Sequence, residues 1–368
     1  MTGDTTVRDL AVSVYTVPTD RPEADGTLQW SETTLVVAEP TAGDHTGLGW
    51  TYGPAACATV LTDLLRDQVV GGDALDVPGL WLRMVRRCRN AGRPGITSMA
   101  VAAADIALWD LKAKLLGLPL CRLLGQARTE VPVYGSGGFT TYDEGTLIDQ
   151  LRHWTDDLGI SRVKIKIGES WGGRPDRDLA RTATARRTVG PDTELYVDAN
   201  GGYTRGQALR MAGALADHDV TWFEEPVSSD DLPALAALRE QVTPDVTAGE
   251  YGYDLHYFER MCAAGAVDCL QADVTRCAGI TEWLRAAAVA AAHGLQVSGH
   301  CAPSLHAHPA AAIPNLRHLE FFHDHARIEG LLFDGALDPT GGTLHPDQGR
   351  PGLGLHLDRA AAEPYRRR

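Results

Sequence analysis

The 368-residue sequence has no apolar run long enough to cross a membrane and no excess of positive charge. Its longest apolar stretches, such as AAAVAAAHGL at 286–295, fall short of the roughly 20 residues that a membrane-spanning helix needs. The formal net charge of −14 argues against nucleic acid or an anionic membrane as a partner. These absences leave an ordinary soluble enzyme as the expectation.

Paired cysteines and a secretion signal are lacking as well. The seven cysteines are an odd number and include no CxxC pair, which indicates incidental thiols in a reducing compartment. The beginning, MTGDTTVRDL, has no basic segment followed by an apolar one, so no signal peptide is visible. We therefore expect a cytoplasmic protein.

The length exceeds the usual limit for one hydrophobic core and predicts two domains. Residues 7–53 alternate apolar and polar side chains with turn breaks, which predicts a three-stranded antiparallel meander. Its first connection, 18–29, is polar and contains Gly and Pro, so we expect a mobile loop that acts as a lid. A helical pattern follows from 54 and closes at Gly117 and Pro119. Residues 1–127 are thus predicted to form an α+β domain.

From about residue 130 a strand-like run and a helix-like run alternate eight times. This pattern predicts an α/β fold, a parallel barrel over 128–325, with 326–368 packing back on the first domain. The strand-like runs are 131–137, 162–168, 193–200, 221–226, 246–250, 269–274, 295–300 and 317–322.

Three of these strand-like runs end in a carboxylate. Asp198, Glu224 and Glu250 are set 26 residues apart (224 − 198 and 250 − 224), a spacing typical of one βα unit. Consecutive strands would bring the three side chains to the same rim of the barrel. Three oxygen ligands suit Mg²⁺ or Mn²⁺ better than zinc. The spacing therefore predicts a metal site.

Two lysines and an acid–histidine pair end other strands of the predicted barrel. Lys164 and Lys166 are two residues apart, so they share one face, and each ammonium should lower the pKa of the other. Alternating lysines on a solvated edge strand are the alternative, but a barrel strand covered by helices has no wet face. Asp273 and His300 end adjacent strands, where the carboxylate can orient the imidazole for acid–base work. Such a site suits abstraction of a proton α to a carboxylate.

At these residues the chain resembles the mandelate racemase subgroup of the enolase superfamily. The resemblance rests on KIKIG, VDANGGY, WFEEP, AGE, QADVTRCAGIT and SGHCAP, together with SMAVAAADIALWDLKAKLLGLPLCRLLG before the barrel. It spans nearly the whole sequence. It implies an α+β capping domain over a (β/α)₇β barrel.

The resemblance also implies roles for individual residues. Asp198, Glu224 and Glu250 would hold Mg²⁺, Lys166 would be the base on one side, and His300 with Asp273 would act on the other. Lys164 would bind the substrate carboxylate or the oxygens near the metal, and Glu320 would lie near that carboxylate. Asn200 would hydrogen-bond a ligand beside the metal, unless it only forms a turn.

The family does not fix the reaction. Members with this lysine and Asp–His pattern that act on sugars are mostly acid-sugar dehydratases, which predicts dehydration of an aldonate or aldarate to a 2-keto-3-deoxy acid. Racemisation, epimerisation and lactone cycloisomerisation use the same two bases and remain alternatives. Residues of the 18–30 segment, Arg21 and Trp30 included, would contact the distal substrate, although a loop arginine is more often only solvated.

Two functions of other classes fit the sequence less well. A metal-dependent hydrolase would use His306 and His308 as a metal pair, but it would leave the three carboxylates without a role. A barrel that only binds a ligand would not need the acids and bases. Related proteins commonly form dimers or octamers, so the resemblance implies a homo-oligomer.

Overall fold

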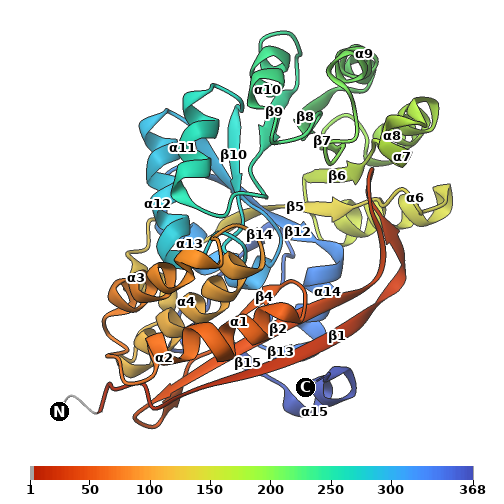
Figure 1. The fold of residues 1–368 in the computed structure, drawn as a ribbon. Coiled ribbons are helices and arrows are strands. Elements are labelled where there is room, and N and C mark those ends of the chain that lie inside the picture. The colour runs from red at the N-terminus through yellow and green to blue at the C-terminus, as the bar shows by residue number, and fades with distance from the viewer. Residues whose placement is uncertain (1–3, 368) are drawn as a thin grey trace.

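Eight parallel strands close into a barrel in the computed structural model, which describes residues 4–367 (Figure 1). The strand order runs from β12 through β11, β10, β9, β8, β7 and β6 to β5, and β12 pairs back with β5. The predicted barrel is therefore confirmed. Its strands are β5 (Val131–Gly137), β6 (Arg162–Lys166), β7 (Glu194–Asp198), β8 (Val220–Glu224), β9 (Asp245–Ala248), β10 (Cys269–Ala272), β11 (Gln296–Gly299) and β12 (Leu316–Phe322).

Helices connect successive strands and cover the outside of the barrel (Figure 1). Their apolar faces join the strand side chains that point outward in one continuous core. They are α6 (Glu144–Arg152), α7 (Glu169–Gly172), α8 (Pro175–Val189), α9 (Arg205–Leu215), α10 (Leu232–Arg239), α11 (Leu255–Ala263), α12 (Ile280–Ala292), α13 (Pro303–Ala312) and α14 (His323–Leu332).

The N-terminal sheet is antiparallel, as predicted, but it has four strands instead of three. The segment expected to be a single third strand splits into two pieces, and both pair with β2. The four strands are β1 (Asp9–Ala24), β2 (Gln29–Ala42), β3 (His45–Thr46) and β4 (Gly49–Tyr52).

The prediction of a loop over 18–29 is wrong for most of the segment, whereas its mobility and its role as a lid stay predictions. Strand β1 continues to Ala24, and its pairing with β2 shifts register between Pro18 and Glu23 before it resumes. Only a tight turn joins the two strands, and Asp25 Oδ1 closes it by accepting from the backbone N–H of Thr27 and Leu28 at 2.6 and 2.7 Å. The hairpin extends beyond its own domain toward the barrel, so its polar side chains are not part of an apolar core of the first domain (Figure 1).

The tip of this hairpin lies on the rim of the barrel. The backbone N–H of Thr140 donates to Ala24 O at 2.8 Å, and that of Trp171 donates to Gly26 O at 2.9 Å. A Cβ on Gly26 would lie 2.7 Å from Ile167 O and 2.8 Å from Ala199 O, closer than real Cβ atoms come. Glycine is therefore required for this close approach.

The helices of the first domain pack the sheet against the barrel. The longest, α4, is buried on most sides, as expected for a helix of alanines and leucines between two layers. Its Asp105 accepts from the Thr281 hydroxyl at 2.6 Å and the Thr281 N–H at 2.9 Å, which fixes the start of α12. The helices are α1 (Ala56–Val60), a π-helical turn (Leu61–Leu65), α2 (Arg66–Val69), α3 (Val77–Arg87), α4 (Ile96–Leu115) and α5 (Leu120–Leu124).

The C-terminal segment contacts both parts of the chain. Strand β14 (Thr343–Leu344) pairs with β5, and the N–H of Leu353 donates to Asp110 of α4 at 2.6 Å. The other elements are β13 (Phe333–Asp334), β15 (His356–Leu357) and α15 (Arg359–Ala362). The division at 127 and 325 stays a prediction.

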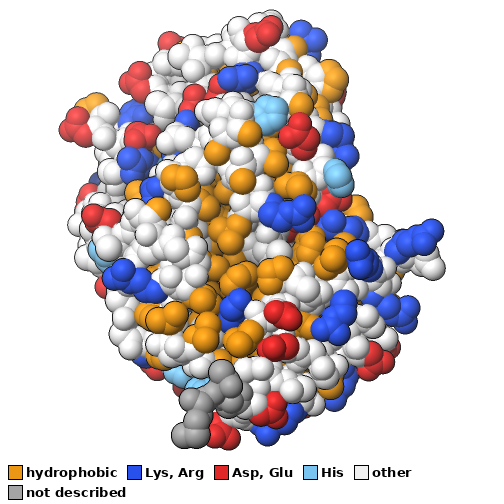
Figure 2. All heavy atoms as spheres, turned by 90° about the vertical axis from the view of Figure 1, so that its left-hand side faces the viewer, with side chains coloured by type: hydrophobic (Ala, Val, Ile, Leu, Met, Phe, Trp, Pro, Cys, Tyr) orange, Lys and Arg blue, Asp and Glu red, His pale blue; other side chains and the backbone are white. Residues whose placement is uncertain are grey.

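Among the described residues, no helix is long and apolar enough to cross a membrane. Hydrophobic side chains gather across the middle of the face on which α3 and α12 lie, and charged side chains surround them (Figure 2). Leu82 of α3 is 39% exposed. The expected homo-oligomer stays a prediction.

Candidate active site

The three predicted metal-ligating carboxylates converge at the carboxyl ends of neighbouring strands. Asp198 and Glu224 are the last residues of β7 and β8, and Glu250 follows the end of β9 by two residues. One carboxylate oxygen from each lies within 4.8 Å of the others, and all three side chains are buried. Three oxygens at this separation can surround one divalent cation.

The carboxylates repel one another and draw in cations. Burial and the neighbouring Asp198 raise the pKa of Glu224 to about 8. Burial also works against ionisation of Asp198 and Glu250, but Lys166 and Lys164 outweigh it at Asp198, and His300 and Arg276 outweigh it at Glu250, so the pKa of each is lowered. A further positive charge among the three carboxylates would reduce the repulsion that raises the pKa of Glu224.

Both lysines of β6 point into the barrel, whereas Ile165 between them packs in the outer core. Lys164 Nζ lies 2.6 Å from Glu224 and 2.8 Å from Glu320, and Lys166 Nζ lies 2.5 Å from Asp198. Lys164 is also 3.6 Å from Asp198, so both lysines contact this carboxylate, and Lys164 additionally bridges to Glu224 and Glu320.

We expected each lysine to lower the pKa of the other to a net extent, and in the observed arrangement of side chains this prediction is wrong. Burial lowers the pKa of the Lys166 ammonium and Lys164 lowers it further, as anticipated, but Asp198 and the other carboxylates outweigh both and raise it. The argument from the lysine pair omitted the acids on the next strand.

Asp273 and His300 form the predicted pair at the ends of β10 and β11. His300 Nδ1 lies 2.8 Å from Asp273 Oδ2, which leaves Nε2 facing Glu250 at 3.4 Å and Glu320 at 3.6 Å. Burial lowers the pKa of His300, but Glu250, Glu320 and the hydrogen bond to Asp273 outweigh burial and raise it. Asp273 thus sets which nitrogen of the ring faces the cavity.

Glu320 and Asn200 complete the predicted set. Glu320 lies within β12, which continues to Phe322, and points inside the barrel, where the Ser136 hydroxyl donates to it at 2.5 Å. Asn200 is a turn residue with φ of 44°, and its N–H donates to Asp198 at 2.9 Å. Its buried Oδ1 has no hydrogen-bond partner among the described residues, which leaves it available to a ligand.

Sequence reasoning missed three groups at this site. The Arg276 guanidinium lies between Glu250, at 3.1 Å, and Asp273, at 3.6 Å. Glu225, with φ of 38°, is buried beside the carboxylate cluster, and burial together with Glu250 raises its pKa well above the ordinary value. The third is Cys301, beside His300. All three lie in the motifs that carry the family resemblance: Glu225 and Cys301 directly follow Glu224 and His300, and Arg276 comes three residues after Asp273, so adjacency was the only available signal.

The histidines that a hydrolase would need do not form a metal pair. His306 Nε2 accepts from the N–H of Val274 at 2.9 Å, and His308 is fully buried. Neither belongs to a group of potential metal ligands among the described residues.

Both domains line one cavity of about 440 Å³ above the carboxylates. The barrel contributes Lys166, Asn200, Glu250, Arg276 and His300, and the hairpin contributes the side chains around Trp30. Arg21 does not line it; its guanidinium donates to Thr146 at 2.9 Å. The remaining lining residues are Asp25, Leu28, Glu32, Thr33, Thr34, Tyr52, Gly53, Pro54, Tyr251, Cys301, Phe322 and His325.

Known proteins share this architecture over the whole chain. A mandelate racemase/muconate lactonizing enzyme-like protein from Rubrobacter xylanophilus is 50% identical, with a TM-score of 0.95 over 98% of this chain and 99% of that one. A 3,6-anhydro-alpha-L-galactonate cycloisomerase from Streptomyces coelicolor is 33% identical over 85% of this chain and 86% of its own length. An L-talarate/galactarate dehydratase from Salmonella typhimurium is 30% identical over 90% of this chain and 82% of its own.

The Salmonella typhimurium dehydratase has been solved with Mg and L-lyxarohydroxamate, and that structure covers all of this chain and 94% of its own at a TM-score of 0.91 and 28% identity. Two family descriptions match the sequence directly. Residues 12–125 match the mandelate racemase/muconate lactonizing enzyme N-terminal domain, and residues 146–361 match the enolase C-terminal domain-like family. The chain therefore belongs to the mandelate racemase/muconate lactonizing enzyme family, within the enolase-like proteins.

Proposed function

We propose that this enzyme dehydrates an acid sugar, removing the proton α to the carboxylate and the hydroxyl at C3 to give a 2-keto-3-deoxy acid. The observation that carries the proposal is the placement of Lys166 and His300 around the carboxylate cluster. In the closed barrel, two strands separate β6 from β11 on one side and four on the other. A substrate between them would meet one proton-transfer group on each face.

Asp198, Glu224 and Glu250 would hold Mg²⁺, with Mn²⁺ as a possible substitute. The three buried oxygens and the unpartnered amide oxygen of Asn200 fit a hard cation. When bound, the cation supplies positive charge that stabilises the enediolate oxygens. With its charge shared with a cation, Asp198 would stabilise the Lys166 ammonium less, which would favour the use of Lys166 as a base.

The protein's own groups supply the remaining steps. Lys166 would take the C2 proton, and Lys164, held by Glu224 and Glu320, would neutralise charge on the substrate carboxylate. His300, oriented by Asp273, would donate a proton to the departing C3 hydroxyl. The resulting enol would then take a proton at C3 and become the keto acid.

The charges around the cavity favour an aldonate over an aldarate as substrate. An aldarate has a carboxylate at both ends, and the second one would need a cation. The lysine and arginine side chains that line the cavity, Lys166 and Arg276, both belong to the barrel and are engaged by its carboxylates. The hairpin contributes the carboxylates of Asp25 and Glu32, and Arg367 pairs with the latter at 2.7 Å.

A substrate screen tests this proposal. Matched pairs of aldonates and aldarates with the same C2 and C3 configuration are incubated with the Mg²⁺-loaded enzyme, and the 2-keto-3-deoxy product is measured. We expect turnover of at least one aldonate and a lower kcat/KM for its aldarate partner. Turnover of aldarates alone would reject the aldonate preference. A screen that yields only epimers or opened lactones would reject dehydration and favour an isomerase, as the cycloisomerase relative would suggest.

A further inference from the structure

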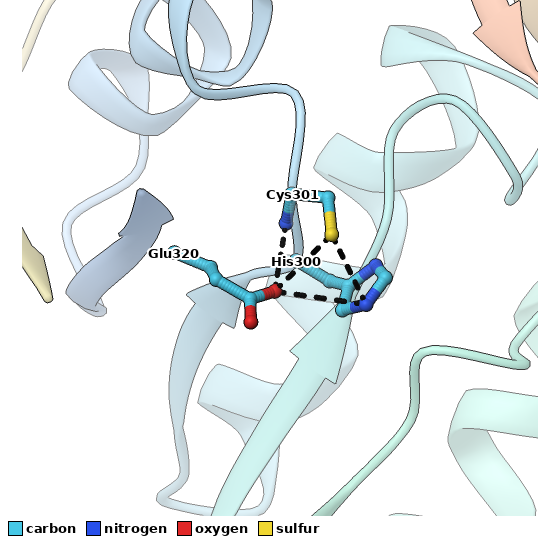
Figure 3. Close-up of side chains that lie close together, drawn as sticks. All are labelled: His300, Cys301 and Glu320. Carbon is cyan, nitrogen blue, oxygen red and sulfur yellow. Dashed lines mark hydrogen bonds and ion pairs between the residues drawn. The ribbon is translucent and has the colours of Figure 1, made fainter. Parts of the chain in front are cut away.

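The thiol of Cys301 forms a second cluster of potential metal ligands with His300 and Glu320. His300 Nε2 and Cys301 Sγ, which follow the end of β11, and Glu320 Oε2, which comes from within β12, point toward one another (Figure 3). The sulfur lies 3.3 Å from the nitrogen and 3.4 Å from the oxygen, and the nitrogen and oxygen are 3.6 Å apart. None of these three atoms is needed by the three-carboxylate cluster.

These separations match those of a tetrahedral zinc centre. Zinc binds histidine nitrogen and carboxylate oxygen at about 2.0–2.2 Å and thiolate sulfur at about 2.3 Å. At a tetrahedral angle, bonds of these lengths place any two ligand atoms about 3.3–3.6 Å apart. An ion could therefore contact all three atoms with little movement of the side chains.

The donor types also select the ion. One sulfur, one nitrogen and one oxygen suit zinc and similar soft or borderline divalent cations, whereas Mg²⁺ requires oxygen ligands. Three protein ligands leave a fourth position, open toward the cavity that Cys301 and His300 line. The carboxylate cluster, with oxygen ligands alone, has the opposite preference.

The backbone holds the thiol in this position. Cys301 and Ala302 have φ values of 56° and 41°, a left-handed conformation that side-chain-bearing residues seldom adopt. The Cys301 N–H donates to Glu320 Oε2 at 3.0 Å, so the same oxygen that faces the sulfur also fixes the turn. The turn after β11 is thus tied to β12 at the point where the three ligand atoms meet.

We propose that His300, Cys301 and Glu320 form a binding site for Zn²⁺ or a similar thiophilic divalent cation, and that its occupancy inhibits the enzyme. On binding, the Cys301 thiol loses its proton to solvent and a sulfur–metal bond forms, with no change of oxidation state. The protonated imidazole likewise releases its Nε2 proton to solvent and binds the metal through the lone pair so freed. His300 then has no free nitrogen for proton transfer, because Nδ1 is held by Asp273.

The inhibitory effect rests on the proposed role of His300, whereas metal binding does not. Binding is tested with Co²⁺ as a spectroscopic probe, added to enzyme kept at saturating Mg²⁺. We expect thiolate-to-cobalt charge-transfer absorption in the wild-type protein that is lost on addition of Zn²⁺. Cys301→Ser, which keeps the side-chain size, should lack the absorption, and Cys57→Ser, a buried cysteine in the core of the first domain, should keep it.

Absence of the band in the wild-type protein, or its persistence in Cys301→Ser, would overturn the proposal. Inhibition by Zn²⁺ is then measured at saturating Mg²⁺, relative to each protein's own activity. Losing a metal-site partner typically costs about 10–100-fold in affinity, so Cys301→Ser should need that much more Zn²⁺ for half inhibition. Equal inhibition of both proteins would show that Zn²⁺ acts at the carboxylate cluster instead. If the band depends on Cys301 but no acid sugar is dehydrated, the metal site stands and the proposed function fails.

Discussion

Glu224 links the carboxylate cluster to the substrate-binding lysine. Its two oxygens bond Lys164 at 2.6 Å and the indole N–H of Trp222 at 2.9 Å. Glutamine in its place would keep the shape and an oxygen for Trp222 but would remove the charge. We expect Glu224→Gln to lose turnover by at least about 10²-fold and to bind Mg²⁺ more weakly, because a metal site is sensitive even to loss of outer partners.

Activity and Mg²⁺ titration calorimetry measure these two effects, and thermal unfolding checks the fold. The variant should unfold no earlier than the wild-type protein, because burial and the neighbouring Asp198 already disfavour a charged side chain at this position. Chelation of wild-type enzyme should abolish turnover and Mg²⁺ should restore it. Full activity of the chelated enzyme would remove the metal from the reaction.

Lys166 and His300 are expected to act on different steps, and their variants can separate the steps. Lys166→Ala should lose the overall reaction by about 10²–10⁴-fold, the usual worth of a positioned acid or base, and so should His300→Asn. If the two groups act independently, one variant retains exchange of the α proton with D₂O, followed by NMR. Near wild-type turnover in either variant would exclude that residue from the catalytic set.

At the residue scale, the sequence predicted side chains that follow a regular strand and missed those that depend on irregular backbone. Asp198, Glu224 and Asp273 could be placed because parallel strands deliver their final side chains to one rim. Cys301 could not, because its thiol reaches Glu320 only through the left-handed turn after β11. The pKa of Lys166 could not be predicted either, since it depends on which carboxylates lie within bonding distance.

At the scale of elements, the β1–β2 hairpin carries a buried acid that couples it to pH. Glu23 is fully buried, and its Oε2 accepts from the Trp30 indole at 2.8 Å. Burial, with a smaller contribution from Asp324, raises the pKa of Glu23 to about 9. Glu23 is therefore protonated in the folded protein at neutral pH.

Glu23→Gln should flatten the dependence of stability on pH. In the wild-type protein the neutral acid stabilises the fold fully below the ordinary pKa of about 4.3, and this contribution is lost as the pH rises toward about 9, because the unfolded chain ionises first. Glutamine cannot ionise and still accepts from Trp30. The unfolding temperature of the variant should thus exceed that of the wild type increasingly between pH 5 and pH 9.

Thermal unfolding at pH 5, 7 and 9 measures this difference. Glu130→Gln is a matched control, because Glu130 is exposed. Its curve should run parallel to that of the wild type. A Glu23→Gln curve that is also parallel would mean that Glu23 ionises in the folded protein as it does in the unfolded chain.

The same hairpin explains why the loop prediction failed. Alternating apolar and polar residues identify a strand when its apolar face packs on the strand's own domain. Beyond Pro18 the hairpin leaves its sheet and contacts the barrel loops instead, so its pattern follows the neighbouring domain. Sequence reasoning from local periodicity cannot detect a partner that is distant in the chain; only the family resemblance placed the segment next to the substrate.

At the scale of the whole molecule, the barrel supplies the reactive groups and the first domain closes the space above them. The barrel strands and the order of the polar residues at their ends could be predicted because each βα unit repeats the same local pattern. The contents of the shared cavity could not, because they depend on how two domains meet. Thr33 and Thr34, which no sequence pattern singled out, enter it only through that docking.

The distribution of solvent deuterium distinguishes dehydration from the isomerase alternatives. A dehydratase breaks the C2–H and C3–O bonds, and the enol so formed takes its new hydrogen at C3. In D₂O the 2-keto-3-deoxy product should therefore carry one deuterium at C3. NMR would locate this deuterium, and mass spectrometry would show a product heavier by about one mass unit than the product formed in H₂O. The polar walls of the cavity, with Thr33, Thr34 and Asn200, suit the hydroxyls of such a substrate. A product that keeps every oxygen and carries deuterium only at C2 would instead identify an epimerase, in which Lys166 and His300 exchange a proton across one carbon.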